Sequence, residues 1–329
     1  MLDSVVQRVT IYGDPKGEAV LVTHALTGSS RVAEWWPGIV GHGKLFDPAE
    51  CAVVGVNALG SCYGSTGPAS ERPDGGGRYG AAFPVVTVGD IVRAQASALE
   101  QLGIGRLRAV AGGSLGGMQA LQWALDYPQR VGKAVVVGAY DHFSAMGIAL
   151  NAVAREAIRI DPRYRGGDYD PADPPTAGIE LARKIAMLTY KSEALFAQRF
   201  GRKLDRSGGN PYANATDRFD VEGYLDHQGT LFSRRMDANA YLALTRAMDL
   251  FDVRDHALPS PCPPLVFVGI GNDWLFPLHL VRAAAGRYAG MGAAATYLQL
   301  DSTHGHDAFL AESDALAELL SPHFLARHP

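Results

Sequence analysis

The sequence lacks the features that mark secreted, membrane-spanning and metal-binding proteins. Only 3 of its 329 residues are cysteines, with no CxxC motif or Cys/His pair, so neither a disulfide framework nor a zinc site is expected. No apolar run approaches the ~18 residues of a membrane span, and the first residues do not resemble a leader. We therefore expect a cytoplasmic protein without a metal ion and without a membrane partner.

The sequence also has no excess of positive charge. Its 30 Lys and Arg against 34 Asp and Glu give a net charge of -4 at pH 7, so no general positive field attracts a nucleic-acid backbone. The content of 47% hydrophobic and 19% charged residues is ordinary for a globular chain with a sizeable core. Nucleic acid is excluded as an expected partner.

Strands and helices alternate in the first and last parts of the chain. Short apolar, β-branched runs predict buried strands at Ala19–Thr23, Ala52–Val56, Leu107–Ala111, Ala134–Val137, Leu265–Val268 and Ala295–Leu300. Helical spacing lies between several of them, at Val88–Leu102 and Met118–Tyr127 for example. This alternation predicts an α/β fold with a mostly parallel central sheet.

The middle of the chain has a different character. Helical patterns without a convincing strand occur at Ile148–Ile160, Ala177–Tyr190, Ala194–Phe200, Val221–Phe232 and Ala238–Leu250. We predict a discontinuous core, residues 1–140 and 258–329, that carries an inserted helical lid at residues 141–257. Ligands of open α/β sheets bind beyond the carboxyl ends of the strands, so the active site is expected where the lid meets those ends.

The strongest local motif is Gly112-Gly113-Ser114-Leu115-Gly116. It has the pattern G-x-S-x-G and lies between a predicted strand and a predicted helix, the context of a nucleophile elbow. Small residues on both sides of the serine let neighbouring backbone pass closely and raise the hydroxyl above the sheet edge. Ser114 is therefore the candidate nucleophile; the alternative is a serine that only caps the helix.

A serine nucleophile needs a base and an acid that orients the base. Asp273 follows one late predicted strand, and two histidines, His304 and His306, follow the next, which completes the order Ser, Asp, His of α/β-hydrolases. Periodicity does not choose between the histidines, and Asp273 could instead cap the following helix or be a solvated loop acid.

An oxyanion hole needs two backbone N–H donors. Leu115, directly after the nucleophile, supplies one, and the loop after the first predicted strand supplies the second from Leu26. His24 in this loop precedes the nucleophile in the chain and is interpreted as a structural residue.

Several motifs together resemble one family, the homoserine O-acyltransferases of the α/β-hydrolase superfamily. The main ones are His24–Gly28, Asn57–Pro68, Gly112–Leu121, Asp273–Pro277 and Gly305–Leu310. Further fitting blocks are Phe83–Thr87, Ala182–Ile185, Phe200–Arg202 and Ala238–Leu242. The resemblance extends from about residue 22 to the last helix.

The resemblance implies an L-homoserine O-acetyltransferase of methionine biosynthesis. Ser114 would take an acetyl group from acetyl-CoA, a co-substrate, and pass it to the homoserine hydroxyl by a ping-pong route; no permanently bound cofactor is implied. The resemblance assigns the base to His306, in the Gly-His-Asp triplet, and the binding of the amino acid to Arg183 and Asp307, with Tyr190 as a weaker candidate. It also implies a homodimer formed through lid helices.

Other interpretations stay open. Without the resemblance, Arg183 fits a surface ion pair on a lid helix. The acceptor could be serine, and the donor could be succinyl-CoA; a carboxylated acyl group would need a further cation, and the sequence does not place Arg31, Lys44 or Arg235 near the site. A serine esterase would use water as the acceptor, and a catalytically silent α/β-hydrolase fold would only bind.

Overall fold

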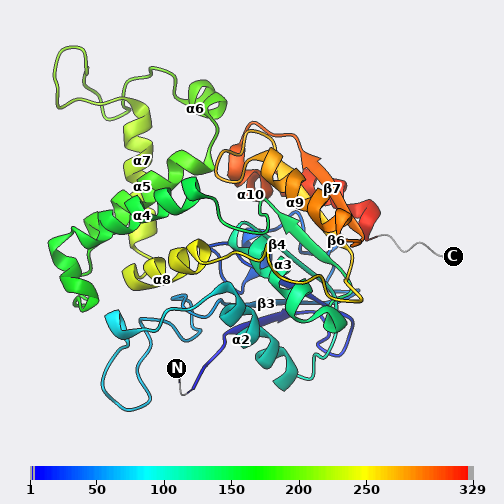
Figure 1. The fold of residues 1–329 in the computed structure, drawn as a ribbon. Coiled ribbons are helices and arrows are strands. Elements are labelled where there is room, and N and C mark those ends of the chain that lie inside the picture. Colours follow the sequence, from blue (N-terminus) through cyan, green and yellow to red (C-terminus); the bar gives the residue numbers. More distant parts are fainter. Residues whose placement is uncertain (1, 3, 325–329) are drawn as a thin grey trace.

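The computed structural model describes residues 2 and 4–324. Its centre is a seven-stranded sheet in the order β1-β3-β2-β4-β5-β6-β7 (Figure 1). The strands are β1 (Val9–Tyr12), β2 (Ala19–Thr23), β3 (Ala52–Val56), β4 (Leu107–Gly113), β5 (Ala134–Val137), β6 (Leu265–Ile270) and β7 (Ala295–Leu300). All neighbouring strands are parallel except β1, which is antiparallel to β3. The predicted mostly parallel α/β sheet is confirmed.

The first strand is the main difference from the sequence-based expectation. β1 pairs with β3 through Val9 and Val56, and all four of its residues are only partly buried. Val9 and Ile11 pack against the apolar cluster on one face and Tyr12 against the cluster on the other. A strand of four partly covered residues at a sheet edge is too short to give a clear pattern. Of the predicted strands, β2 to β6 are buried along nearly their whole length, whereas β7 at the other edge is mostly only partly buried. β4 and β6 each continue two residues beyond the prediction.

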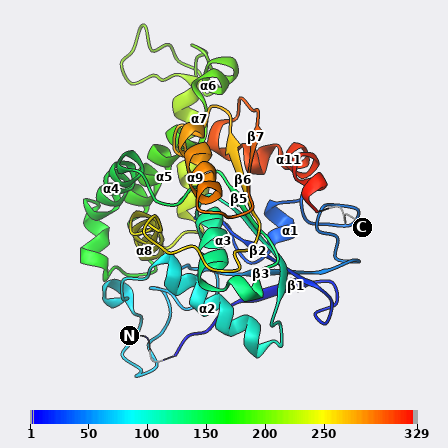
Figure 2. The same ribbon diagram turned by 45° about the vertical axis from the view of Figure 1, so that its right-hand side comes forward.

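Helices cover both faces of the sheet, as Figure 2 shows. One face carries α2 (Val88–Gln101), α3 (Leu115–Asp126) and α9 (Leu278–Gly290); the other carries α1 (Val32–Trp35) and α11 (Ser313–Leu320), with the short α10 (Ala308–Ala311) before it. α2 begins where Thr87 and Asp90 form a capping box, which satisfies otherwise free N–H groups of its first turn. A separate apolar cluster lies on each face, so both faces of the central strands are buried.

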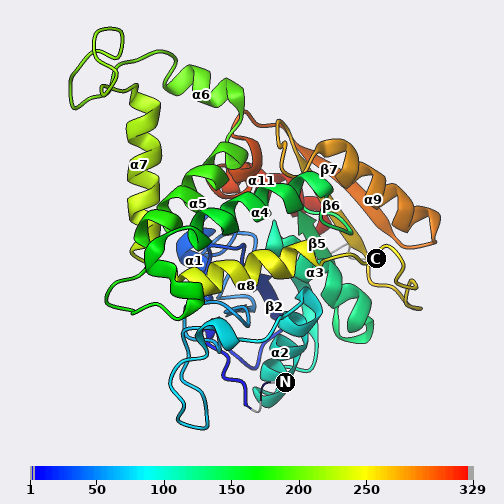
Figure 3. The ribbon, with the colours of Figure 1, turned by 60° about the vertical axis from the view of Figure 1, so that its left-hand side comes forward.

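Residues 141–257, here called the helical segment, connect the adjacent strands β5 and β6. The helices are α4 (Ala145–Arg159), α5 (Thr176–Tyr190), α6 (Glu193–Arg199), α7 (Asp220–Ser233) and α8 (Ala238–Asp249). They begin and end within a few residues of the predicted ones. α5 packs between α4 and α7, while α6 and the connection to α7 lie far from the sheet (Figures 1 and 3). The division into a core and a lid stays a prediction.

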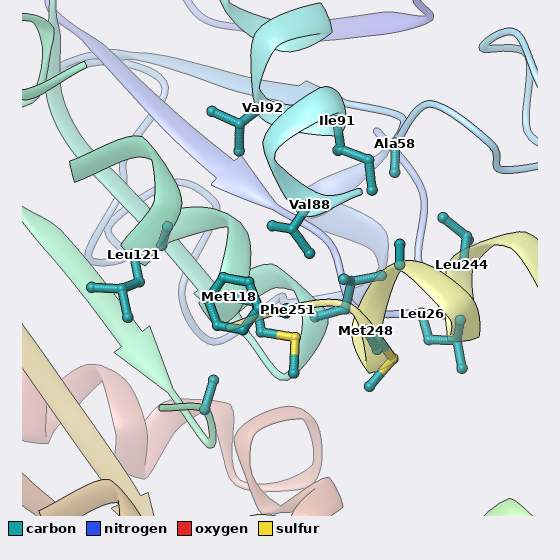
Figure 4. Packing of buried hydrophobic residues seen from close by; sticks show 14 of the residues in the cluster. Leu26, Ala58, Val88, Ile91, Val92, Met118, Leu121, Leu244, Met248 and Phe251 are labelled. Carbon is teal, nitrogen blue, oxygen red and sulfur yellow. The ribbon is translucent and has the colours of Figure 1, made fainter. Parts of the chain in front are cut away.

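The helical segment is joined to the sheet through an apolar contact region. Leu244 and Met248 of α8 lie in the same buried cluster as Met118 of α3, and Leu26 from the loop after β2 belongs to it as well (Figure 4). The loop that carries Leu26 is therefore held between the sheet-covering helices and the helical segment. Within the part of the chain that the structure describes, no helix is long and apolar enough to cross a membrane.

Candidate active site

Ser114 occupies a strained turn between β4 and α3. Its φ of 59° and ψ of -124° lie in a region that residues with a side chain rarely adopt, and its N–H donates to the carbonyl of Val137 at 2.9 Å. A Cβ atom on Gly116 would lie 2.2 Å from the carbonyl oxygen of Thr23, and one on Gly112 would lie 2.3 Å from its hydroxyl. The glycines of the motif are thus required for close packing of the turn against the end of β2.

Asp273 and His306 form a buried pair. Asp273 follows β6, His306 follows β7, and His306 Nδ1 lies 2.7 Å from Asp273 Oδ2. The other carboxylate oxygen accepts the N–H groups of Leu275 and Phe276 at 3.0 and 2.8 Å. These contacts orient the imidazole with Nδ1–H toward the carboxylate and leave Nε2, which is buried and has no hydrogen-bond partner among the described residues. This is the arrangement that a general base requires.

The two candidate histidines have different surroundings. His304 is about one-third exposed, and its Nε2 lies 3.7 Å from a carboxylate oxygen of Glu312. The side chain of His306 is 3% exposed. Burial by itself would lower the pKa of His306, but the charge and hydrogen bond of Asp273, together with the charge of Asp307, outweigh burial and raise the pKa above its ordinary value. The geometry therefore favours His306 as the base.

The turn that carries Ser114 packs against Phe309, a neighbour of His306. A Cβ atom on Gly113 would touch the ring of Phe309 at 2.5 Å, and that ring packs edge-on against His306 with centroids 5.6 Å apart. A Cβ atom on Gly138 would lie 3.4 Å from His306 Cε1. No hydrogen bond joins the Ser114 hydroxyl to His306 within residues 2 and 4–324; catalytic hydrogen bonds often tighten only when a substrate is bound.

The loop after β2 is fixed by His24. Its Nδ1–H donates to the carbonyl of Ala25 at 2.7 Å, and its Nε2 accepts the N–H of Ala58 at 2.9 Å. Burial lowers the pKa of His24 to about 4, so the ring is neutral and both nitrogens are occupied. His24 therefore has a structural role, as expected, and it holds the loop next to Leu26.

The two expected oxyanion donors are Leu26, in the loop after β2, and Leu115, at the start of α3. The side chain of Leu26 is part of the apolar core, which fixes its backbone at the end of β2. Leu115 is the first residue of α3, so its N–H has no acceptor within the helix. Their role as the oxyanion hole stays a prediction.

Sequence reasoning missed a buried polar chain behind this loop. Trp123 donates its indole N–H to Gln95 at 2.9 Å, Gln95 donates to Gln119 at 2.7 Å, and Gln119 donates to the carbonyl oxygen of His24 at 3.1 Å. Gln95 and Gln119 are fully buried. Polar residues on the apolar faces of two helices were the available signal, because a buried amide needs partners.

The end of α5 brings Tyr190 and Lys191 to His306 and Asp307. The rings of Tyr190 and His306 have centroids 5.9 Å apart, and Lys191 Nζ lies 2.9 Å from Asp307 Oδ2. The sequence analysis did not single out Lys191. A Cβ atom on Gly305 would lie 2.8 Å from the backbone nitrogen of Ser192, so the two segments pack backbone against backbone.

Arg183 lies on α5 between two aromatic rings. Its guanidinium carbon is 5.3 Å from the ring centre of Tyr190 and 5.1 Å from that of Phe232. The atoms Nε and Nη1 are buried and have no hydrogen-bond partner among the described residues. The surface ion pair considered for Arg183 is therefore absent from the described part of the chain, and its guanidinium is available to an anion.

Arg183 also lines a cavity of about 770 Å³, together with Arg235 and residues of the loop after β2. Arg31 lies at the same cavity and pairs with Glu34 at 3.2 Å, whereas Lys44 pairs with Asp314 at 2.9 Å and does not line it. Of the three cations that the sequence left unplaced, two thus belong to this cavity. The described residues include no group of three or more His, Cys, Asp or Glu side chains that could hold a metal ion.

Known sequences that are similar to this chain are named homoserine O-acetyltransferases or homoserine O-succinyltransferases. Residues 18–313 match the family model of the alpha/beta hydrolase fold. Homoserine O-acetyltransferase of Methanosphaerula palustris is 42% identical over 92% of this chain, which spans 64% of that protein. Homoserine O-acetyltransferase of Caulobacter vibrioides is 43% identical over 92% of this chain and 83% of its own length. Homoserine O-succinyltransferase of Bordetella pertussis is 45% identical over 89% and 76%.

Solved structures agree with the fold. Homoserine O-acetyltransferase from Bacillus anthracis superposes with a TM-score of 0.87 at 24% identity, over 97% of this chain and 91% of that one. Esterase E22 superposes with a TM-score of 0.86 at 26% identity, over 98% of this chain and 100% of its own. Fold, motifs and relatives together establish that the chain belongs to the homoserine O-acyltransferase family of the α/β-hydrolase fold.

Proposed function

We propose that this chain is an L-homoserine O-acetyltransferase that uses acetyl-CoA, acts in methionine biosynthesis in the cytoplasm, and works as a homodimer without a permanently bound cofactor. The observation that carries the proposal is the buried Asp273–His306 pair beside the strained turn of Ser114, in a chain with relatives above 40% identity that are named homoserine O-acetyltransferases.

In the first half-reaction, Ser114 Oγ attacks the thioester carbonyl while its proton passes to His306 Nε2. Asp273 stabilises the imidazolium that forms. The backbone N–H groups of Leu26 and Leu115 stabilise the oxyanion. When the C–S bond breaks, His306 returns the proton to the sulfur, so that CoA leaves as a thiol and the acetyl group stays on Ser114.

In the second half-reaction, the homoserine hydroxyl replaces the thiol. It gives its proton to His306, attacks the acetyl-serine carbonyl, and the returning proton restores the Ser114 hydroxyl. Water competes with homoserine for this intermediate. The helical segment over the carboxyl edge of the sheet would reduce the access of water and so favour transfer.

The amino acid is proposed to bind through its two charged groups. Among the described residues, Arg183 has no partner for Nε and Nη1, so a substrate carboxylate would offset the cost of its burial. Asp307 would bind the ammonium group through Oδ1, because Lys191 already contacts Oδ2. The ring of Tyr190 contacts both the ring of His306 and the guanidinium of Arg183. It would form the wall of this subsite.

Two other functions have specific support. The 45% identity to a homoserine O-succinyltransferase favours succinyl transfer by the same residues. The superposition on esterase E22 favours ester hydrolysis, in which water takes the place of homoserine.

One assay separates these functions. Purified protein receives acetyl-CoA or succinyl-CoA, each with homoserine, serine or no acceptor, and the release of free CoA thiol is followed. Fast release that requires acetyl-CoA and homoserine together is the expected result. Release without an acceptor would identify a hydrolase, and preference for another pair would change the named substrates. Mass spectrometry of the Ser114 peptide after incubation with acetyl-CoA alone would detect the acetyl-enzyme of a ping-pong route.

A further inference from the structure

The cavity that contains Arg183 is unusually positive for this protein. Four arginines line it, Arg8, Arg31, Arg183 and Arg235, against one acidic side chain, Glu34. The chain as a whole carries a net charge of -4, so this local excess is opposite in sign to the average. The pairing of Arg31 with Glu34 cancels one charge and leaves the others. A concave surface with such a charge attracts anionic ligands.

Arg235 lies just after α7 and reaches across to the core. Its Nη1 donates to the carbonyl oxygen of Thr27 at 2.9 Å and to the hydroxyl of Tyr63 at 2.8 Å. Its guanidinium carbon lies 5.2 Å from the ring centre of Phe232, the same ring that Arg183 contacts. A guanidinium has five N–H donors, and Nη1 supplies only two of them. The other edge of Arg235 is available to a ligand.

The guanidinium groups of Arg183 and Arg235 therefore face the same cavity. No ion pair to a carboxylate forms at Arg183 or Arg235 within residues 2 and 4–324. Like charges in one cavity destabilise each other unless an anion lies between or beside them. In the proposed function the carboxylate of the acceptor engages Arg183. Homoserine has no second anionic group, so an anionic ligand of Arg235 would come from the donor.

We propose that Arg235 binds an anionic group of the acyl-CoA donor, in the cavity between the loop after β2 and the end of α7. The proposal rests on the acyl-CoA-dependent function argued above. Two groups have this chemistry, a phosphate of CoA and the carboxylate of a dicarboxylic acyl chain such as succinyl. Arg235 contacts Thr27, the residue after Leu26, so the same side chain links donor binding to the loop of the oxyanion hole.

The test uses three donors and two variants. The donors are acetyl-CoA, succinyl-CoA and the acetyl thioester of pantetheine, which has neither a phosphate nor an acyl carboxylate. Arg235→Gln is compared with Arg234→Gln, a matched loss of charge at an exposed neighbour that does not line the cavity. We expect Arg235→Gln to lower kcat/KM for a CoA thioester by roughly 10- to 100-fold, the range of one charge-assisted contact. Arg234→Gln should match the wild type.

The pattern over donors identifies the group. Equal losses with both CoA thioesters, and none with the pantetheine thioester, assign the contact to a phosphate. A loss with succinyl-CoA alone assigns it to the acyl carboxylate. Equal losses with all three donors would overturn the proposal, because Arg235 would then act only by positioning Thr27. An unchanged kcat/KM with every donor would overturn it as well.

A binding measurement keeps this inference separate from the proposed function. CoA, succinyl-CoA and pantetheine are titrated calorimetrically into the Ser114→Ala protein, with and without Arg235→Gln, so that no donor is consumed. Weaker binding of the anionic ligands alone supports the role of Arg235, even if homoserine proves not to be the acceptor. Failure of the wild type to acylate homoserine with any donor refutes the proposed function instead.

Discussion

At the carboxyl edge of the sheet, Asp273 and His306 bind each other, whereas Arg183 and Arg235 of the helical segment face a cavity. Asp273 accepts two backbone N–H groups and contacts His306, and the whole pair is buried. Arg183 and Arg235 stack on aromatic rings and have no carboxylate partner among the described residues. The first arrangement is complete within the chain, while in the proposed function the second is completed by a ligand.

In the proposed function, this difference separates the groups that carry out the reaction from the groups that select the substrate. Substitutions at the sheet edge should impair the reaction with every substrate, because they remove groups that act on the reacting atoms. Substitutions in the helical segment should change which substrate is used, because they remove groups that contact its remote parts. The following variants test that separation, beginning with the largest expected effect.

Ser114→Ala should break the sheet-edge function completely. We expect thiol release to fall by at least about 10³-fold with every donor and acceptor, since no hydroxyl remains to carry the acyl group. The assay is thiol release together with mass analysis of the acyl-enzyme, and an unchanged melting temperature would serve as the control for folding. Full turnover in this variant would overturn the assignment of the nucleophile.

Arg183→Ala should affect only the acceptor. We expect KM for homoserine to rise roughly 10- to 100-fold, because a charge-assisted contact to the carboxylate is lost, while acylation by the donor alone stays largely intact. Arg183→Lys keeps the charge but not the planar fork, and should recover part of the affinity. Loss of acylation with unchanged acceptor affinity would contradict the separation of the two regions.

Gln119→Leu tests the comparison at a residue outside the proposed site, because Gln119 supports the loop that carries Leu26. Without its donor to the carbonyl of His24, the loop that carries Leu26 loses one restraint. We expect kcat to fall by about 10-fold with all substrates and KM to change little. Gln122→Leu is the matched control, since Gln122 lies on the same helix and, among the described residues, its side chain bonds only to Asp126. A similar fall in the control, or an effect on KM alone, would contradict a positioning role.

Asp307→Asn should have the smallest effect on acylation. We expect a shift in the pH dependence of kcat/KM for the donor. His306 must be neutral to act as a base, so activity is lost as pH falls through its pKa. The charge of Asp307 helps to raise that pKa, and its removal should move the acid limb to lower pH. In a ping-pong reaction, kcat/KM for the donor reports the free enzyme and isolates this effect from acceptor binding. A limb that stays in place or moves to higher pH would contradict the coupling.

Local signals carried much of the fold and the outline of the site. Most predicted strands and helices agree with the structure to within a few residues, because buried strands are continuous apolar runs. Ser114 was found because a tight strand-to-helix turn demands glycines around it. Asp273 and the pair of histidines His304 and His306 were predicted because residues after consecutive parallel strands meet at one edge, and the resemblance to the family selected His306.

The remaining features depend on contacts between distant segments. β1 is short and only partly buried, and it pairs with the edge of β3. The pairing of Lys191 with Asp307 and the placement of Arg235 beside Thr27 arise when the helical segment packs against the strand ends. Neither contact has a periodicity or a motif of its own, so no pattern in the sequence predicts either of them.

The interruption between β5 and β6 also has a consequence for biosynthesis. These strands are neighbours in the sheet, yet the ribosome makes the entire helical segment between them. The loop-closure entropy of such an insertion grows only logarithmically with its length, so the cost to stability is small, but long-range pairing slows folding. Strands β1 to β5, with Ser114, precede the helical segment in the chain and can assemble before it is made, while Asp273 and His306 follow it. A chain interrupted within the helical segment would therefore carry Ser114 without the Asp273–His306 pair, and in the proposed function it would hold a serine without its base.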